Sequence, residues 1–197
     1  VNNGGGGKVL VNGLLTVTGG QTYGTGFYVN GSGSTTVLAA DIITAGTDVL
    51  IDDAVMVDGA NIGIDTTALG AIPAGADVTL TGGTRGIFSR GGVNNNLTLD
   101  GGTDGIVEIG YLRGLGTSVD GSLVGNLTAK GHGISLYSDN TLNGDLTLNS
   151  SYVTLYGNVQ SWTGSITLLG ETSLQNDVNL TAGKSILLNS TVNGSGK

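Results

Sequence analysis

The second half of the chain repeats one short sequence pattern of apolar and polar residues at a nearly constant spacing. Four similar tetrads follow one another at steps of about 20 residues, the period that is typical of a solenoid. In a solenoid each repeat is one turn of a superhelix and packs on its neighbours. The period therefore predicts a stacked, elongated architecture. The tetrads are Asn126-Leu127-Thr128-Ala129, Asp145-Leu146-Thr147-Leu148, Ser165-Ile166-Thr167-Leu168 and Ser185-Ile186-Leu187-Leu188.

Each repeat has the pattern of short strands joined by turns. In residues 144–163, Leu146 and Leu148 flank Thr147, which places the aliphatic pair on one face of a strand and the threonine on the other. A second strand with the same alternation surrounds Thr154, and Val159 is expected on a third side of the coil. Gly, Asn and Ser supply the turns between these strands. We therefore predict an all-β fold, a parallel β-helix or β-solenoid with about 20 residues per coil.

Stacked coils place equivalent side chains in columns about 4.8 Å apart. The inward aliphatic residues are expected to form the core columns, and the threonines between them are expected to form a ladder on the outer surface. The expected core residues form two columns, one of Leu127, Leu146, Ile166 and Ile186 and a second of Ile134, Val153 and Leu174. The expected outward ladder consists of Thr79, Thr98, Thr128, Thr147 and Thr167.

The repeat pattern divides the chain into two parts. Residues 76–197 are expected to form regular β-helix coils. The alternating pattern of a strand already recurs before the four tetrads, at Val78–Leu80, Leu97–Leu99 and Ile106–Ile109. The steps from Val78 to Leu97 and from Ile106 to Leu127 are close to the period of the tetrads. Residues 1–75 contain strand-like sequences that do not recur at a constant spacing. We expect irregular N-terminal coils there, or a linker followed by strands, with glycine-rich residues 1–7 as the flexible part.

Composition excludes several classes of protein. Charged residues make up 11% of the chain, and the formal net charge is −8 with basic residues scattered along the sequence, so nucleic acid is a poor partner. No apolar stretch approaches the about 18 residues that a membrane helix needs, and no membrane insertion is expected. Without cysteine and with one histidine, the usual zinc ligand sets are excluded. We expect no cofactor and no metal.

A carbohydrate-cleaving enzyme on the same scaffold is the first alternative. Clustered carboxylates and arginines on neighbouring coils are the groups that such a site would use. The candidates are Asp52, Asp53, Arg85, Arg90 and Arg113. Adjacent residues of a strand face opposite sides, so Asp52 and Asp53 are expected at a solvated turn or edge and not as a converging catalytic pair.

An ice-binding solenoid is the second alternative, because a regular threonine array on a flat face is suited to contact ice. Such faces use two adjacent threonine columns. The Thr-x-Thr motif that would supply two columns occurs only at Thr16/Thr18 and Thr79/Thr81. Threonine on an exposed strand is also explained by its β-propensity.

The repeats resemble those of one family of bacterial exoproteins. The text in Gly125-Asn126-Leu127-Thr128, in Gly144-Asp145-Leu146-Thr147 and in residues 181–190 is similar to the short repeats of filamentous-haemagglutinin-type proteins. The resemblance covers about residues 95–197. It implies a right-handed parallel β-helix that is secreted by a two-partner or autotransporter route and serves as an adhesin shaft. The Asn-Pro-Asn signatures of the family's secretion domain are not present, since the single proline is Pro73.

The functional hypothesis is therefore a segment of a secreted or cell-surface bacterial protein without enzymatic activity, either a β-helical adhesin or an extracellular filament. Neither terminus has a sequence typical of a segment that caps the end of a solenoid. We therefore expect a segment of a longer chain or a unit that stacks head to tail. The expected partners are further copies of the chain, or a host or matrix glycan or protein.

Overall fold

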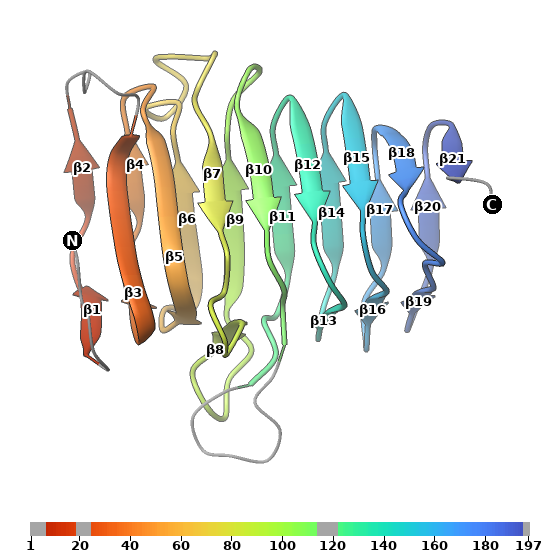
Figure 1. Cartoon of the computed structure of the whole chain (residues 1–197), viewed down its shortest axis with the longest axis horizontal. Helices are drawn as coiled ribbons and strands as arrows, with labels where there is room; N and C mark the ends of the chain where they lie inside the picture. Colours follow the sequence, from red (N-terminus) through yellow and green to blue (C-terminus); the bar gives the residue numbers. More distant parts are fainter. Residues whose placement is uncertain (1–6, 19–24, 114–121, 195–197) are drawn as a thin grey trace.

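The computed structural model describes residues 7–18, 25–113 and 122–194. These residues form strands and turns and contain no helix. The chain crosses back and forth between two long sheets that face each other (Figure 1). We call them the front sheet and the back sheet, after the view of Figure 1.

The front sheet contains ten strands, ordered along the long axis of the molecule with β8 paired at the side of β5. They are β1 (Lys8–Val11), β3 (Thr25–Leu38), β5 (Asp48–Val57), β7 (Val78–Leu80), β8 (Ile87–Ser89), β10 (Ile106–Ile109), β12 (Gly133–Leu136), β15 (Tyr152–Leu155), β18 (Glu171–Leu174) and β21 (Val192–Gly194).

The back sheet contains eight strands, and a third, shorter sheet of three strands closes the side of the last coils. The back strands are β2 (Leu15–Val17), β4 (Ile42–Thr44), β6 (Asn61–Asp65), β9 (Asn96–Asp100), β11 (Leu127–Lys130), β14 (Leu146–Asn149), β17 (Ile166–Leu168) and β20 (Ile186–Leu188). The side strands are β13 (Asn140–Leu142), β16 (Val159–Ser161) and β19 (Leu180–Ala182).

All pairs of neighbouring strands within these sheets are parallel, and strands inside a sheet pair with their equivalents one coil before and one coil after. The all-β, parallel, stacked architecture predicted from the repeats is thereby confirmed. Val159 lies in the side sheet, so the expectation of a third side is confirmed as well.

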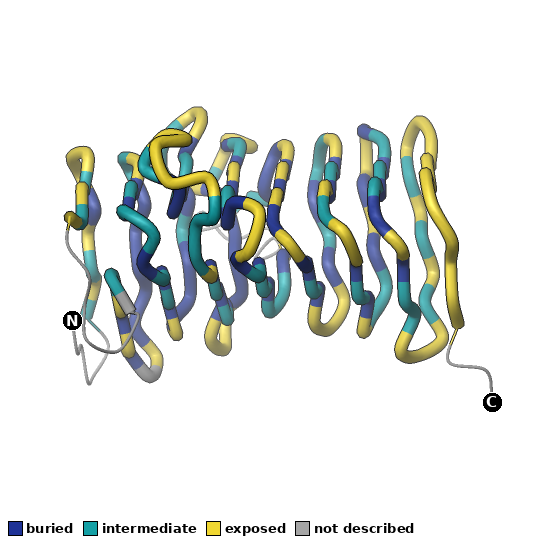
Figure 2. The backbone as a smooth tube through the Cα atoms, turned by 90° about the horizontal axis from the view of Figure 1, so that it is seen from above, coloured by how far each residue is buried: buried dark blue, intermediate teal, exposed yellow. Residues whose placement is uncertain are grey.

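Apolar columns in register fill the space between the two long sheets. In the back sheet Leu127 pairs with Leu146, Leu146 with Ile166, and Ile166 with Ile186. The first three are fully buried, whereas Ile186 in the last described coil is 43% exposed. Figure 2 shows the same change, from buried positions in the middle coils to an exposed final coil. Each fully buried aliphatic side chain contributes about 1.5–3 kcal/mol relative to exposure.

The front-sheet column contains one departure from the expected core. Ile134 pairs with Val153 as expected, but the partner of Val153 in the next coil is Thr172 and not Leu174. Leu174 belongs to the neighbouring column, where it pairs with Leu155. Placing Leu174 in the column of Ile134 and Val153 was therefore wrong. Thr172 is tolerated inside because its hydroxyl donates a hydrogen bond to the Gly170 carbonyl at 3.2 Å.

The length of chain between equivalent positions changes along the solenoid. The corner residue Asp145 follows its equivalent Asn126 by 19 residues, but Asn126 follows Asn96 by 30. Longer connections contribute to this difference: residues 101–105 join β9 to β10, whereas only residues 131 and 132 join β11 to β12. Val78–Leu80 and Leu97–Leu99, which the simple period treated as equivalent, lie on opposite sheets. Spacing alone therefore misassigned them.

The strands of the N-terminal part of the chain belong to the same two long sheets as the later strands. Strands β1, β3 and β5 extend the front sheet, and β2, β4 and β6 extend the back sheet, so the described part of residues 1–75 belongs to the same stack as the later coils. Residues 1–6 of the expected flexible segment lie outside the described residues.

We predict that the core column and the outward residues differ sharply in their contribution to stability. Leu146→Ala removes a fully buried side chain and is expected to lower the free energy of unfolding by about 2–5 kcal/mol. The adjacent outward substitution Thr147→Ala is the matched control and is expected to change it by at most about 0.5 kcal/mol. Urea unfolding followed by circular dichroism measures both. Equal effects would contradict the assigned faces.

Candidate functional site

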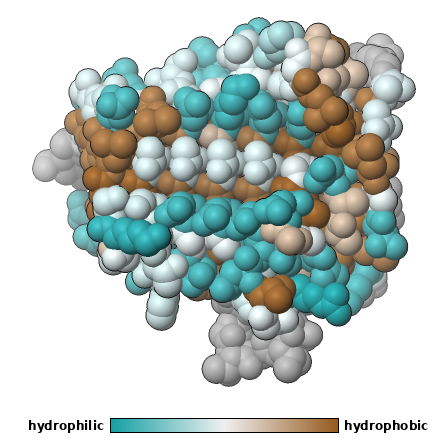
Figure 3. Space-filling model, turned by 180° about the vertical axis from the view of Figure 1, so that it is seen from behind, coloured by the Kyte–Doolittle hydropathy of each residue, from teal (hydrophilic) through white to brown (hydrophobic). Residues whose placement is uncertain are grey.

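The outer face of the back sheet carries a row of threonines. Thr98, Thr128, Thr147 and Thr167 pair directly with one another along four consecutive coils. Gly63 precedes the row and Leu187 follows it at the same register. Figure 3 views this face and shows that side chains of similar hydropathy form rows along the solenoid.

Thr79 does not belong to this row. It lies on β7 of the front sheet, where it pairs with Leu50 and with Glu108. Its hydroxyl donates a hydrogen bond to Glu108 Oε2 at 3.3 Å. Including Thr79 in the outward ladder was wrong, because Val78–Leu80 and Leu97–Leu99 have the same alternation but belong to different sheets.

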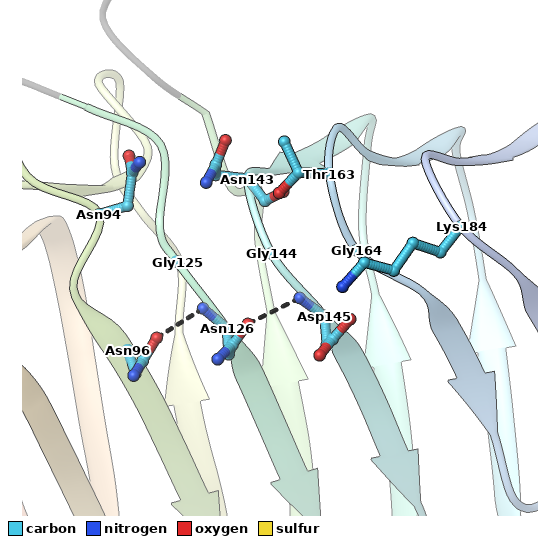
Figure 4. Close-up of a pocket in the computed structure, with 10 residues that line it drawn as sticks. All are labelled: Asn94, Asn96, Gly125, Asn126, Asn143, Gly144, Asp145, Thr163, Gly164 and Lys184. Carbon is cyan, nitrogen blue, oxygen red and sulfur yellow. Dashed lines mark hydrogen bonds between the residues drawn. The ribbon is translucent and has the colours of Figure 1, made fainter.

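A ladder of side-chain hydrogen bonds runs along one corner of the solenoid, at the start of the back-sheet strands (Figure 4). Asn96 Oδ1 accepts a hydrogen bond from the backbone N–H of Asn126 at 2.8 Å, and Asn126 Oδ1 accepts one from the N–H of Asp145 at 2.7 Å. Asp145 Oδ1 continues the ladder by accepting from the N–H of Ser165 at 2.8 Å. Each side chain therefore joins its own coil to the backbone of the next coil. We call this set the corner ladder.

Sequence reasoning did not identify the corner ladder, although a signal for it was present. The text Gly-(Asn/Asp)-Leu-Thr places an acceptor side chain immediately before two successive back strands. The preceding glycine allows the coils to approach, because a Cβ at Gly144 would lie 2.2 Å from Asn126 Oδ1. The Asn or Asp in this repeat is thus explained by inter-coil hydrogen bonding.

A shallow polar groove of about 380 Å³ runs along this corner. In Figure 4 the side chains of Asn94, Asn143 and Thr163 lie on one side of three glycines and the corner ladder on the other, with Lys184 at the end. None of the ten residues that line the groove is aromatic. One side-chain oxygen of each corner-ladder residue already accepts a hydrogen bond from the backbone. Fewer acceptor positions in the groove are therefore free to bind a ligand.

A comparable pair of carboxylates lies at the start of front-sheet strands. Asp48 Oδ1 accepts a hydrogen bond from the N–H of Asp77 at 3.1 Å, and Asp77 Oδ1 accepts one from the N–H of Ile106 at 2.7 Å. Partial burial, which disfavours the charged form, raises the pKa of Asp48 above its usual range. The backbone hydrogen bond opposes this shift, and the nearby charge of Asp77 adds to it.

Asp52 and Asp53 face opposite sides of β5, as adjacent strand residues must. Asp52 is exposed and accepts a hydrogen bond from Thr81 Oγ1 at 3.0 Å. Asp53 is only 1% exposed and accepts hydrogen bonds from the hydroxyls of Ser34 at 2.8 Å and Thr36 at 3.3 Å. The expectation of a solvated turn or edge was therefore wrong for Asp53. It lies beside the register shift between β3 and β5, where its carboxylate bonds the irregular part of β3.

The three arginines considered for an enzyme site have separate partners. Arg90 forms an ion pair with Asp58 at 3.0 Å. Arg85 lies 5.6 Å from the centre of the Phe88 ring, and Arg113 lies 5.7 Å from that of Tyr111.

Within residues 7–18, 25–113 and 122–194, no group of three or more His, Cys, Asp and Glu side chains is placed to hold a metal ion. In the same residues, no helix has the length and apolar character needed to cross a membrane.

Comparison of the chain with protein-family models, with curated proteins and with solved structures found no match.

We predict that the corner ladder stabilises the stack. Asn126→Ala removes the acceptor of the Asp145 N–H and is expected to lower the free energy of unfolding by about 1 kcal/mol. Asn94→Ala, on the opposite rim of the same groove, is the matched control and is expected to have a smaller effect. Chemical unfolding of both variants measures the difference. A larger loss for Asn94→Ala would contradict the role given to the corner ladder.

Proposed function

We propose that this chain is a segment of an extracellular bacterial surface protein that acts without enzymatic activity, as the shaft of an adhesin or as part of a filament. The observation that carries the proposal is the unbroken stack of parallel strands through all described parts of the chain. Such a stack presents long outer faces at fixed spacing and joins every coil to the next by backbone hydrogen bonds.

The finer geometry of the coil belongs to this proposal. We infer a right-handed solenoid, because connections between parallel strands of one sheet are almost always right-handed. A coil of about 20 residues is the proposed basic unit, supported by the pairs Leu127–Leu146, Leu146–Ile166 and Ile166–Ile186. The longer upstream coils are this unit with inserted loops.

The use of the polar side chains supports a mechanical role. Side chains of the corner ladder and of Asp48 and Asp77 hydrogen-bond the backbone of the next coil. The ion pairs Arg90–Asp58 and Lys130–Asp100 also join residues of different coils. Separating two coils therefore breaks backbone, side-chain and apolar contacts together, which is the property that a stiff rod requires.

The proposed partners are further copies of the chain, or a host or matrix glycan or protein. Head-to-tail contact is supported by the last described coil, where Ile186, Leu187 and Val192 are exposed on strands that end their sheets. A further coil, whether of this chain or of another copy, would cover these side chains.

Ice binding remains a second candidate because one observation favours it, the in-register row from Thr98 to Thr167. The columns beside this row contain Asn126 and Asp145 on one side and Lys130 and Asn149 on the other. Charged neighbours make this a less suitable ice-binding face than two adjacent threonine columns. Thermal hysteresis of the purified protein measures this activity directly.

We predict that the protein is accessible on intact cells and forms rods or fibres. Surface exposure is measured by antibody labelling and protease shaving of intact producing cells, with a cytoplasmic protein as the control. Electron microscopy over a concentration series is expected to show fibres, or isolated rods roughly 40–50 Å long if about 4.8 Å separates successive coils. Access to the protein only after lysis, or release of new reducing ends from polysaccharides, would contradict the proposal.

A further inference from the structure

The outer face of the front sheet contains a hollow of about 290 Å³, lined by Thr79, Leu80, Thr81, Glu108, Gly110 and Tyr137. It lies over three consecutive coils. Ile109 of the central coil pairs with Leu80 and with Leu136, so the residues that follow these three, Thr81, Gly110 and Tyr137, occupy equivalent positions. The central member of this column has no side chain. The backbones of Thr81 and Tyr137 are therefore about two coil spacings apart, roughly 9–10 Å, with no side chain from the coil between them at this position.

The close approach of two coils excludes a side chain at Gly110. A Cβ on this residue would lie 1.8 Å from the carbonyl oxygen of Thr81, closer than any real contact. No other residue fits there without movement of one coil against the other. The absence of a side chain at the centre of the hollow is thus a consequence of the stacking.

Tyr137 forms one wall of the hollow and is held from two directions. Its ring stacks on that of Tyr156 with the centroids 4.7 Å apart and an interplanar angle of 17°. Its hydroxyl donates a hydrogen bond to Glu108 Oε1 at 2.9 Å, and this bond is the main reason that the pKa of Tyr137 is raised. Because Tyr156 covers the face toward the following coil, the other face of the ring is directed toward Gly110. Tyr137 is 37% exposed.

Glu108 places acceptors beside this ring. One carboxylate oxygen receives the Tyr137 hydroxyl and the other receives the Thr79 hydroxyl. A carboxylate has about four acceptor positions, so two further donors from a ligand can be bound. The Thr81 hydroxyl at the opposite wall donates to Asp52, which adds a second carboxylate at that end.

We propose that this hollow binds one neutral hexopyranose residue of a glycan, with a C–H face of the sugar on the Tyr137 ring and sugar hydroxyls donating to Glu108. An apolar ring face beside a few fixed polar groups is the usual composition of a small-molecule site. The carboxylates of Glu108 and Asp52 and the net charge of −8 disfavour an anionic sugar. The inference deepens the proposed adhesive function by naming a class of ligand, and it rests on that function.

Saturation-transfer NMR with cellotetraose, lactose and tetragalacturonate tests the site on the protein of residues 1–197. The wild-type protein is expected to bind at least one neutral probe and to saturate the axial ring protons of one sugar most strongly. Binding of tetragalacturonate is expected to be weaker. Absence of binding by both neutral probes at about 10 mM, or a preference for the anionic probe, would overturn the proposal.

Two tyrosines of the front sheet supply a matched pair of variants. Tyr137→Ala is expected to weaken binding at least tenfold, whereas Tyr152→Ala, a residue 38% exposed that packs edge-on against His132, is expected to leave it within twofold. Circular dichroism and urea unfolding of each variant show whether it is folded. Glu108→Gln is a third variant and is expected to weaken binding severalfold while the fold is kept. Equal affinities of Tyr137→Ala and the wild type would overturn the site.

The outcome is independent of the tests of the shaft. Rods or fibres on the cell surface without glycan binding would overturn the hexopyranose site alone. Glycan binding through Tyr137 by a protein found only inside cells would support the site and overturn the proposed extracellular role.

Discussion

The stacking of aliphatic side chains in register is the interaction on which the rest of this structure depends. Residues such as Leu127, Leu146 and Ile166 meet their equivalents directly and are fully buried. Because side chains alternate between the two faces of a strand, a slip of one residue would expose the whole column and bury the threonines. The apolar columns therefore fix the register, and the register fixes every outward row.

The outer surface follows as a lattice with one coil spacing along its length. A repeated side chain gives a row, as for the four threonines of the back sheet. A repeated acceptor at a corner gives the corner ladder, whose side chains bond the backbone of the next coil. A missing side chain within a column, as at Gly110, gives a hollow with walls one coil away on each side. The proposed hexopyranose site thus lies where the repetition is interrupted.

The fold could be predicted from the sequence where the chain is free of insertions. In the back sheet from Leu127 onward the alternation and the period agree, and the predicted pairs are those of the structure. Upstream, loops change the length of each coil, so spacing alone placed Thr79 on the wrong sheet. Leu174 was misplaced because Thr172 occupies the core position of its strand through a local hydrogen bond. The hollow at Gly110 could not be predicted, because it depends on which residues of three separate coils share a column.

The register between the upstream coils can be measured by cross-linking in a chain that contains no cysteine. The pair Thr98→Cys and Thr128→Cys occupies directly opposed, outward positions. Their Cα atoms are about 4.8 Å apart, which lies within the Cα–Cα range of a disulfide. The pair Thr79→Cys and Thr98→Cys follows the simple sequence period but lies on opposite sheets. The observed register predicts that mild oxidation of the monomeric protein removes both free thiols of the first double variant and neither thiol of the second. Cross-linking of the second pair and not of the first would contradict it.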